Sequence, residues 1–222
     1  LQIGVYTMRY RMHSHRYASA ILNTDTDFEQ NWIEVQEVLD TITEEDIITE
    51  FLSKGMNRGK SISAAINSLL KREFIARGWQ DESYIFQNPD YREKTWRLDF
   101  AKEHISIEVA FNHGGVIAWN LLKPVLASEL NHVQKAIQTQ LGIIICATES
   151  MKVAGGFDSA IGTYEKFIEY LPPLNNQLTV PLLIIGLEAP ETFRIEHVPH
   201  PTKNRTLIGN VVRNDYCMDV IL

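Results

Sequence analysis

The clearest alternation of hydrophobic and polar positions lies in residues 97–111 and predicts a β-hairpin. In its second strand, apolar side chains fall at every second position: Ile105, Ile107, Val109 and Phe111. Because neighbouring side chains of a strand point to opposite faces, Glu108 shares the other face with Ala110. A carboxylate among apolar neighbours is costly unless a metal or a hydrogen-bond partner compensates it. The hairpin brings Asp99, near the end of the first strand, to Glu108, and this pairing predicts a shared divalent cation.

Apolar residues at helical spacing predict five further segments. They cover residues 27–39, 43–52, 61–78, 116–140 and 159–171. We expect Asp25 or Asp27 to cap the first helix, a capping-box sequence to begin the second, and Ser61 or Ser63 to cap the third. Pro124 should interrupt or kink the fourth.

Two continuous apolar runs, residues 141–147 and 180–187, have the length of strands and predict strands buried on both faces. Weaker strand signals lie at residues 84–86, 195–198 and 207–212. The last two segments are expected at sheet edges. The basic, aromatic residues 6–17 fit a strand with a loop, an arm that touches phosphate, or a solvated N-terminal segment. The alternation of helices with buried strands predicts an α/β core with a central mixed β-sheet and helices on both faces.

Composition sets wide bounds on the class of protein. The length fits one domain over residues 1–222. No apolar run approaches the roughly 20 residues of a membrane span, so we expect no membrane as a partner. Cys146 and Cys217 are isolated, which favours a reducing, cytoplasmic setting. The net charge of −7 argues mildly against nonspecific binding of polyanions, but a nuclease needs basic groups along one cleft only.

The run from Asp99 to Phe111, with its Glu-Val-x-Phe sequence, resembles the active site of type II restriction endonucleases of the PD-(D/E)xK superfamily, most closely the BglII/BstYI group. Further segments of that group have counterparts here in the same order: residues 15–23, the helix around Trp32, Ala76-Arg-Gly-Trp79, Met151-Lys152, and residues 159–165 and 180–187. The ordered set carries the resemblance, because the hairpin spacing alone occurs by chance. It implies a restriction-endonuclease-like core and sequence-specific cleavage of double-stranded DNA at a short palindrome, built around GATC, in a restriction–modification system.

The resemblance also implies Mg²⁺ as the cofactor. Asp99 and Glu108 match the family's two metal-binding acids, and the backbone carbonyl of Val109 matches the usual third ligand. The cation would lower the pKa of a bound water and neutralise charge on the phosphate. Glu82 lies where the family places a polar group at a helix end, and it is either an additional ligand to metal or water or an ordinary surface residue.

The chain departs from the family at the third catalytic position, Ala110. The superfamily usually carries Lys there and the BglII/BstYI group carries Gln, a side chain taken to orient or polarise the attacking water. Ala110 has no polar side-chain atom. Either a natural Lys or Gln has been replaced, or the protein lacks the group and cuts poorly, or it recruits another side chain such as His113 or Lys102. We therefore expect this chain to be inactive or impaired.

Residues that would contact DNA follow from the same resemblance. Asn112 and His113 follow the catalytic strand and are candidates for recognising bases in the major groove. Ser159 lies in a second loop of this kind. Candidates for phosphate contacts are Arg58, Lys60 and Lys152. Asn112, His113 and Ser159 are equally compatible with ordinary turn positions.

Two classes of function stay open. The first is a metal-dependent endonuclease that acts as a homodimer, because a palindromic duplex matches a two-fold protein. Apolar residues on several faces of segment 116–140 place the expected dimer contact there. The second is a noncatalytic DNA-binding relative of the same fold. An unrelated α/β protein, the third alternative, would leave Asp99 and Glu108 far apart.

Overall fold

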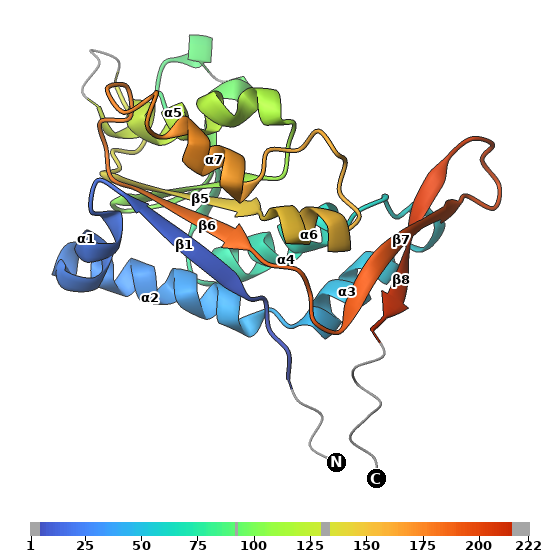
Figure 1. Ribbon diagram of the computed structural model, residues 1–222. Helices are drawn as coiled ribbons and strands as arrows, with labels where there is room; N and C mark the ends of the chain where they lie inside the picture. The colour runs from blue at the N-terminus through green and yellow to red at the C-terminus, as the bar shows by residue number, and fades with distance from the viewer. Residues whose placement is uncertain (1–4, 92, 130–133, 215–222) are drawn as a thin grey trace.

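A six-stranded mixed β-sheet forms the centre of the protein (Figure 1). The computed structural model describes residues 5–91, 93–129 and 134–214. The strands are β1 Tyr10–His15, β2 Gln80–Tyr84, β3 Arg97–Lys102, β4 Ile105–Ala110, β5 Leu141–Ala147 and β6 Leu182–Leu187. They lie in the order β1-β6-β5-β4-β3-β2, with β4, β5 and β6 parallel and the other pairs antiparallel. This arrangement confirms the predicted mixed sheet.

Helices lie on both faces of this sheet. They are α1 Ala18–Thr24, α2 Thr26–Thr41, α3 Glu44–Ser53, α4 Ser63–Ala76, α5 Ile117–Ser128, α6 Glu149–Ala154 and α7 Tyr164–Tyr170, with short 3-10 turns at Gly55–Asn57, Pro89–Tyr91, Lys94–Trp96 and Gly114–Val116. Asp25 caps α2 by accepting the Asp27 N–H, and Thr43 begins α3 with a capping box, as predicted. The predicted cap of helix α4, Ser61 or Ser63, is wrong: Ile62 occupies the N-cap position, and no side chain caps the helix there.

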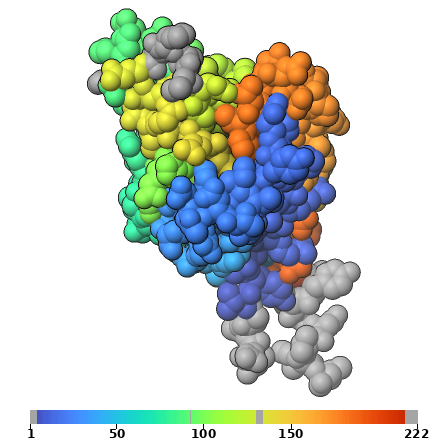
Figure 2. Space-filling view, turned by 90° about the vertical axis from the view of Figure 1, so that its left-hand side faces the viewer, coloured from blue at the N-terminus to red at the C-terminus, as the bar shows by residue number. Residues whose placement is uncertain are grey.

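Alternating side chains of the buried strand β5 supply two separate cores. Ile143 and Ile145 belong to the cluster that also contains apolar residues of α1 to α4. Ile144 and Cys146 belong to the cluster shared with α5 and α7. Strands β1 and β6 are far apart in sequence yet adjacent in the sheet, and Figure 2 shows the blue N-terminal segment against the orange C-terminal third. The predicted burial of residues 141–147 on both faces is therefore confirmed.

Three predicted boundaries are wrong. The strand predicted at residues 84–86 lies earlier, at β2. The prediction missed it because its polar sequence, Gln-Asp-Glu-Ser-Tyr, carries little of the apolar signal that marks a strand. Helix α5 ends at Ser128 and residues 134–140 are not helical, while residues 130–133 lie outside the described part. Helix α7 begins five residues later than predicted, at Tyr164 and not Ser159 (164 − 159), because the backbone of residues 158–162 turns back and bonds to another loop.

The last two strands, β7 Phe193–Pro199 and β8 Leu207–Arg213, form their own antiparallel two-stranded sheet. They were expected at the edges of the main sheet, but β1 and β2 already occupy both edges. This β7–β8 ribbon projects from one end of the molecule beside α3 (Figure 1). Within the described ranges, no helix combines the length and apolar character that crossing a membrane requires.

Candidate active site

The hairpin of β3 and β4 opens at the point where Asp99 lies. Its ladder pairs Lys102 with Ile105 and ends with Phe100 opposite Ile107. Beyond that pair, the Asp99 side chain takes the place of a ladder acceptor, because its Oδ2 accepts the backbone N–H of Val109 at 2.7 Å. The hydrogen bond holds the Asp99 carboxylate against the strand that carries Glu108.

Glu108 is a buried acid with one satisfied oxygen. Its side chain is 2% exposed, and its Oε2 accepts a hydrogen bond from Lys123 Nζ at 2.6 Å. Its Oε1 is buried and has no hydrogen-bond partner among the described residues. Ala110, 1% exposed, belongs to the apolar cluster that contains α5 residues. Glu108 and Ala110 thus face α5 together, as strand alternation predicts.

The two carboxyl groups influence each other electrostatically. Burial raises the pKa of Glu108 to about 8, the nearby charge of Asp99 raises it further, and Lys123 opposes the shift. Burial also raises the pKa of Asp99, against the lowering effect of the Val109 N–H. The site therefore holds two acids that are poorly solvated and repel each other, and this is the condition that a bound cation relieves.

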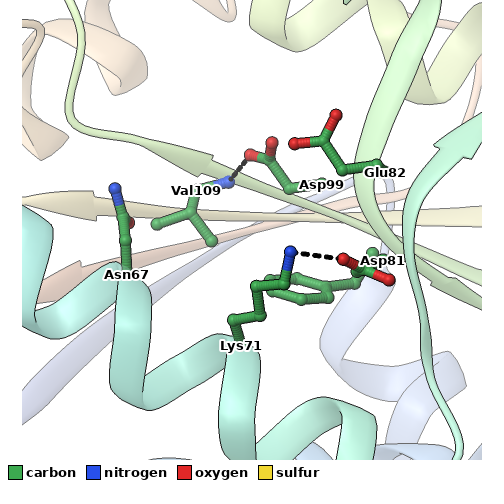
Figure 3. A pocket seen from close by; sticks show the side chains of 7 residues that line it. Asn67, Lys71, Asp81, Glu82, Asp99 and Val109 are labelled. Carbon is green, nitrogen blue, oxygen red and sulfur yellow. Dashed lines mark hydrogen bonds and ion pairs between the residues drawn. The ribbon is translucent and has the colours of Figure 1, made fainter.

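A cavity of about 170 Å³ lies beside Asp99, between α4 and the hairpin (Figure 3). Its lining residues are Asn67, Lys71, Asp81, Glu82, Asp99, Phe100 and Val109. Asn67 and Lys71 are one turn apart on α4, and Lys71 Nζ lies 2.5 Å from Asp81 Oδ2. Asn67, Lys71 and Asp81 belong to no motif that would reveal them in the sequence, and only the fold brings them to Asp99.

Glu82, expected at a helix end, lies instead within β2 at the edge of this cavity. Its backbone has a positive φ of 49°, an uncommon conformation for a residue other than glycine. Its exposed carboxylate accepts a hydrogen bond from Arg97 Nη1 at 2.9 Å. The charge of Glu82 also contributes to the raised pKa of Asp99, so this residue is part of the electrostatic surroundings of the site.

Lys123, which contacts Glu108, is a further residue of the site that the sequence analysis missed. It is the only charged residue between Ile117 and Ser128 in α5, and a lone charge in an apolar helix was the signal that could have identified it. The next residue, Pro124, packs its ring on Gly142 of β5 so closely that a Cβ added to Gly142 would lie 2.4 Å from Pro124 Cβ. This contact holds α5 close to the sheet, where Lys123 reaches Glu108.

The predicted base-recognition loops lie next to each other. The Gly114 N–H donates to Ala160 O at 2.7 Å, and the Gly162 N–H donates to Asn112 O at 3.0 Å. Three of their residues, Asn112, His113 and Ser159, are exposed. Asn112 Oδ1 accepts from Asn120 Nδ2 at 3.0 Å, and His113 Nδ1 accepts the Gly115 N–H at 2.9 Å. The structure thus brings together two loops that are more than 40 positions apart in the sequence (159 − 113 = 46).

The three residues predicted to contact phosphate differ in their exposure and in their present hydrogen-bond partners. Arg58 donates from Nε to Gly209 O at 2.8 Å and from Nη1 to Gly55 O, so its guanidinium fastens the β7–β8 ribbon. Lys60 lies exposed in the same loop. Lys152 donates to Glu149 Oε2 at 2.7 Å and is only 17% exposed. Of the three, Lys60 is the exposed one.

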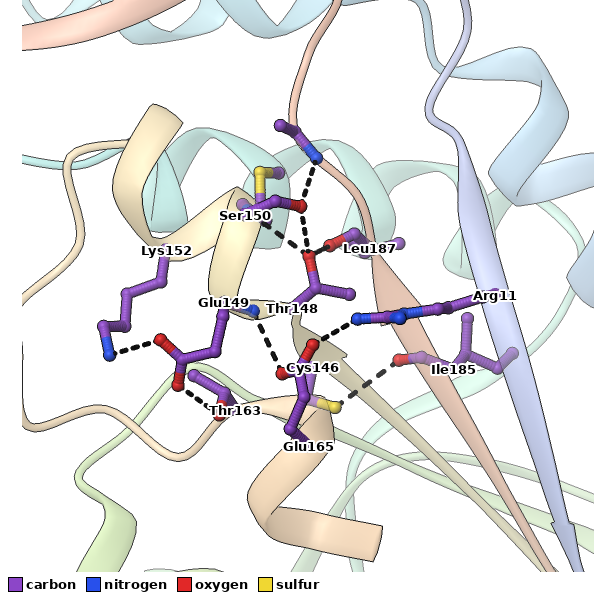
Figure 4. A network of polar contacts seen from close by, with 12 residues as sticks. Arg11, Cys146, Thr148, Glu149, Ser150, Lys152, Thr163, Glu165, Ile185 and Leu187 are labelled. Atoms are coloured by element: carbon purple, nitrogen blue, oxygen red, sulfur yellow. Dashed lines mark hydrogen bonds and ion pairs between the residues drawn. The ribbon is translucent and has the colours of Figure 1, made fainter.

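Lys152 belongs to a polar network that joins α6, α7 and β1 (Figure 4). Glu149 accepts from both Lys152 and Thr163. Glu165 accepts the Glu149 N–H at 3.0 Å and pairs with Arg11 of β1. The network fastens both ends of segment 155–163, which contains Ser159, to the sheet.

The fold is that of a restriction endonuclease. The chain belongs to the family described as "Restriction endonuclease BglII/BglIII", whose model matches residues 10–187. This match confirms the resemblance and excludes the unrelated α/β alternative. DNA endonuclease is the activity that this family and fold imply.

Two solved structures show the likeness in detail. One is restriction endonuclease BglII complexed with a DNA 16-mer, with 17% identity over 93% of this chain and 100% of that chain and a TM-score of 0.61. The other is free BglII, with 19% identity, the same coverage and a TM-score of 0.53. At these identities the likeness shows the fold alone. No curated protein sequence matches the chain.

Proposed function

We propose that the protein is a site-specific endonuclease that hydrolyses double-stranded DNA with Mg²⁺ at the hairpin of Asp99 and Glu108. One observation carries the proposal: two mutually repelling, largely buried carboxyl groups sit together in a restriction-endonuclease fold. The family resemblance adds a short palindromic target built around GATC and a role in restriction–modification. The isolated cysteines, of which the described Cys146 is buried and free, support a cytoplasmic setting.

The residues of the hairpin fit a hard divalent cation. Glu108 offers a buried oxygen, Oε1, that lacks a partner among the described residues. Among the described residues, no group of three or more His, Cys, Asp or Glu side chains is arranged for a metal. The protein would therefore supply only two carboxylates, those of Asp99 and Glu108. The Val109 carbonyl and water would complete the ligand set. When bound, it would activate water and neutralise charge on the phosphate.

The protein's own groups prepare this site before DNA binds. The Val109 N–H fixes the orientation of Asp99, and Lys123 fixes that of Glu108. Preorganised donors and acceptors need no rearrangement at the moment of reaction. Glu82, held by Arg97 at the edge of the cavity, would bind and orient solvent there.

DNA recognition would use the adjoining loops. The exposed side chains of Asn112, His113 and Ser159 present amide, imidazole and hydroxyl groups, which can form hydrogen bonds with base edges. Lys60 would contact phosphate, and Lys152 and Arg58 would do so only by sharing or leaving their present partners. A palindromic target calls for two copies of these loops, so we propose that the enzyme acts as a homodimer.

The test is cleavage of a mixture of duplexes that contains all short palindromes, with Mg²⁺, followed by sequencing of the cut ends. The unmodified chain should bind one palindrome and cut it, at a rate set by whether another side chain replaces the polar group that Ala110 lacks. Asp99→Asn and Glu108→Gln should each abolish cutting and the calorimetric signal of Ca²⁺ binding, because each removes an ionised ligand. Binding of the cut duplex without metal should survive or tighten, since one carboxylate fewer repels the phosphate.

Asp90→Asn serves as the matched control, because Asp90 is an exposed carboxylate outside the cavity. It should leave cleavage and Ca²⁺ binding unchanged. Unaltered Ca²⁺ affinity in Asp99→Asn or Glu108→Gln would refute the metal site. Specific binding without any cutting by the unmodified chain would instead support the noncatalytic DNA-binding relative.

A further inference from the structure

We infer that Lys123, from helix α5, supplies the catalytic polar group that is absent at Ala110. The inference rests on the proposed endonuclease function and names a further catalytic residue for it. In this arrangement, the Lys123 amine reaches Glu108 from helix α5, which covers this face of the strand. In relatives with a long polar side chain at position 110, that side chain would instead reach the site from the strand itself. The expectation that Ala110 leaves the chain impaired then loses its basis.

Geometry places the Lys123 amine on the correct side of the sheet. Its Nζ lies 2.6 Å from Glu108 Oε2, and Glu108 and Ala110 share the face that α5 covers. The Lys123 side chain is 12% exposed, so the amine is held in the site and does not extend into solvent. The small side chain of Ala110 leaves the space over this face to α5.

The other candidate cations are engaged elsewhere. Lys102 donates to both carboxylate oxygens of Glu34, at 2.9 and 2.8 Å, and to a backbone carbonyl at 2.8 Å, which uses all three ammonium donors. His113 is exposed and accepts a backbone N–H. Lys71 pairs with Asp81 across the cavity. Lys123 is the described lysine whose amine contacts a carboxylate of the hairpin pair.

The remaining donors of Lys123 define its role. An ammonium group has three N–H donors, and among the described residues Glu108 is its one hydrogen-bond partner. The other two can hold the attacking water and a phosphate oxygen. In hydrolysis, the water oxygen forms a bond to phosphorus, the bond from phosphorus to the leaving sugar oxygen breaks, and that oxygen takes up a proton. The water loses its proton to solvent, and Lys123 stays an ammonium throughout.

The decisive variant is Lys123→Met, which keeps the length of the side chain and removes the donors. Single-turnover cleavage of the cut palindrome in saturating Mg²⁺ should fall by about 10²–10⁴-fold, the usual effect of a positioned water-orienting group. Binding of the same duplex without metal should weaken several-fold, because a positive charge near the phosphate is lost. Adding Ala110→Lys to Lys123→Met should restore much of the cleavage, because residue 110 faces the same side as Glu108.

Lys203→Met is the matched control: it also removes one lysine, from an exposed turn of the β7–β8 ribbon. It should leave cleavage unchanged. Melting curves establish that Lys123→Met is folded, and if it is not, Lys123→Arg takes its place and should also slow cleavage, since its donors lie on a planar group.

Each result decides the inference. Slow cleavage by Lys123→Met with rescue by Ala110→Lys supports it, because a purely structural lysine would not be replaced from a different element. A wild-type rate in Lys123→Met overturns this inference and leaves the endonuclease function intact. Absence of cutting by the unmodified chain on every duplex overturns both.

Discussion

The side chain of Glu108 is only 2% exposed. One carboxylate oxygen accepts a hydrogen bond from Lys123, and the other has no partner among the described residues. A pKa raised to about 8 means that an increasing share of Glu108 is protonated as the pH falls below 8 in the metal-free protein. A divalent cation must displace this proton, so metal affinity should rise steeply with pH up to about 8. The residue that the sequence marks as a ligand is thus also a pH-dependent element of the site.

This linkage predicts that stability falls as pH rises. A carboxyl whose folded-state pKa is raised above its ordinary value of 4.5 binds its proton more tightly when folded, so its contribution is complete below pH 4.5 and is lost by about pH 8. The raised pKa of Asp99 acts in the same direction. In EDTA, the free energy of unfolding from urea titrations should decrease from pH 5 to pH 8. The upper limit of the slope is about 1.4 kcal/mol per pH unit for one group.

Glu108→Gln should flatten that decrease, because glutamine does not titrate in this range. Asp90→Asn, at an exposed site, should keep it. Parallel curves for the unmodified chain and Glu108→Gln would contradict the buried, proton-binding state of Glu108.

At the scale of single elements, the sequence predicts well where one segment determines its own structure. Strand β5 occupies the predicted residues 141–147, since seven apolar residues in a row fit one environment only. The hairpin and the position of Asp99 against the strand of Glu108 were also predicted, because the alternation and the spacing are local. Strand β2 was missed, since its polar residues form a strand only by pairing with β3. A lone charge in an apolar helix marks Lys123 as unusual, but its partner was missed for the same reason as β2: the contact joins α5 to β4, and no local pattern encodes that pairing.

The crossing of α5 over the sheet depends on Gly142 and gives a prediction of its own. In Gly142→Ala, the added methyl group would lie 2.4 Å from Pro124 Cβ and 2.8 Å from Leu182 Cδ2, so the helix or the strand must move. We expect a loss of about 1–3 kcal/mol in the free energy of unfolding, as for other overpacked cores. Single-turnover cleavage should slow as well, because Lys123 would move away from Glu108.

Gly59→Ala is the matched control for stability. A methyl group there would meet only backbone atoms of Ser61, at 3.9 Å or more. Urea unfolding should therefore show a near-wild-type free energy for Gly59→Ala and a reduced one for Gly142→Ala. Equal values for the two variants would show that the Pro124 contact does not determine the position of α5.

For the whole molecule, the structure changes the reason for expecting a dimer. The sequence predicts a dimer contact from the apolar residues on several faces of this segment, but those of α5 serve two cores: Leu121 packs with the α7 cluster, and Ala127 with the cluster around Phe86. Trp119 stacks edge-on against Trp96 within the same chain, with ring centroids 5.2 Å apart. The apolar character of α5 is thus accounted for by one chain. The expectation of a homodimer now rests on the family and on the symmetry of a palindromic target.

A surface position still tests whether the start of α5 lies in the dimer contact. Val116 precedes α5, is 37% exposed and lies next to the loop of Asn112 and His113. If two copies meet there, Val116→Asp would place two like charges at the contact and should shift the protein towards monomer in light scattering. Val153→Asp, at a 76% exposed position on α6, should not.

The unmodified chain should have the mass of a dimer, with or without DNA. A monomer mass at every concentration, even with the cut palindrome present, would mean that each copy recognises and cuts DNA alone.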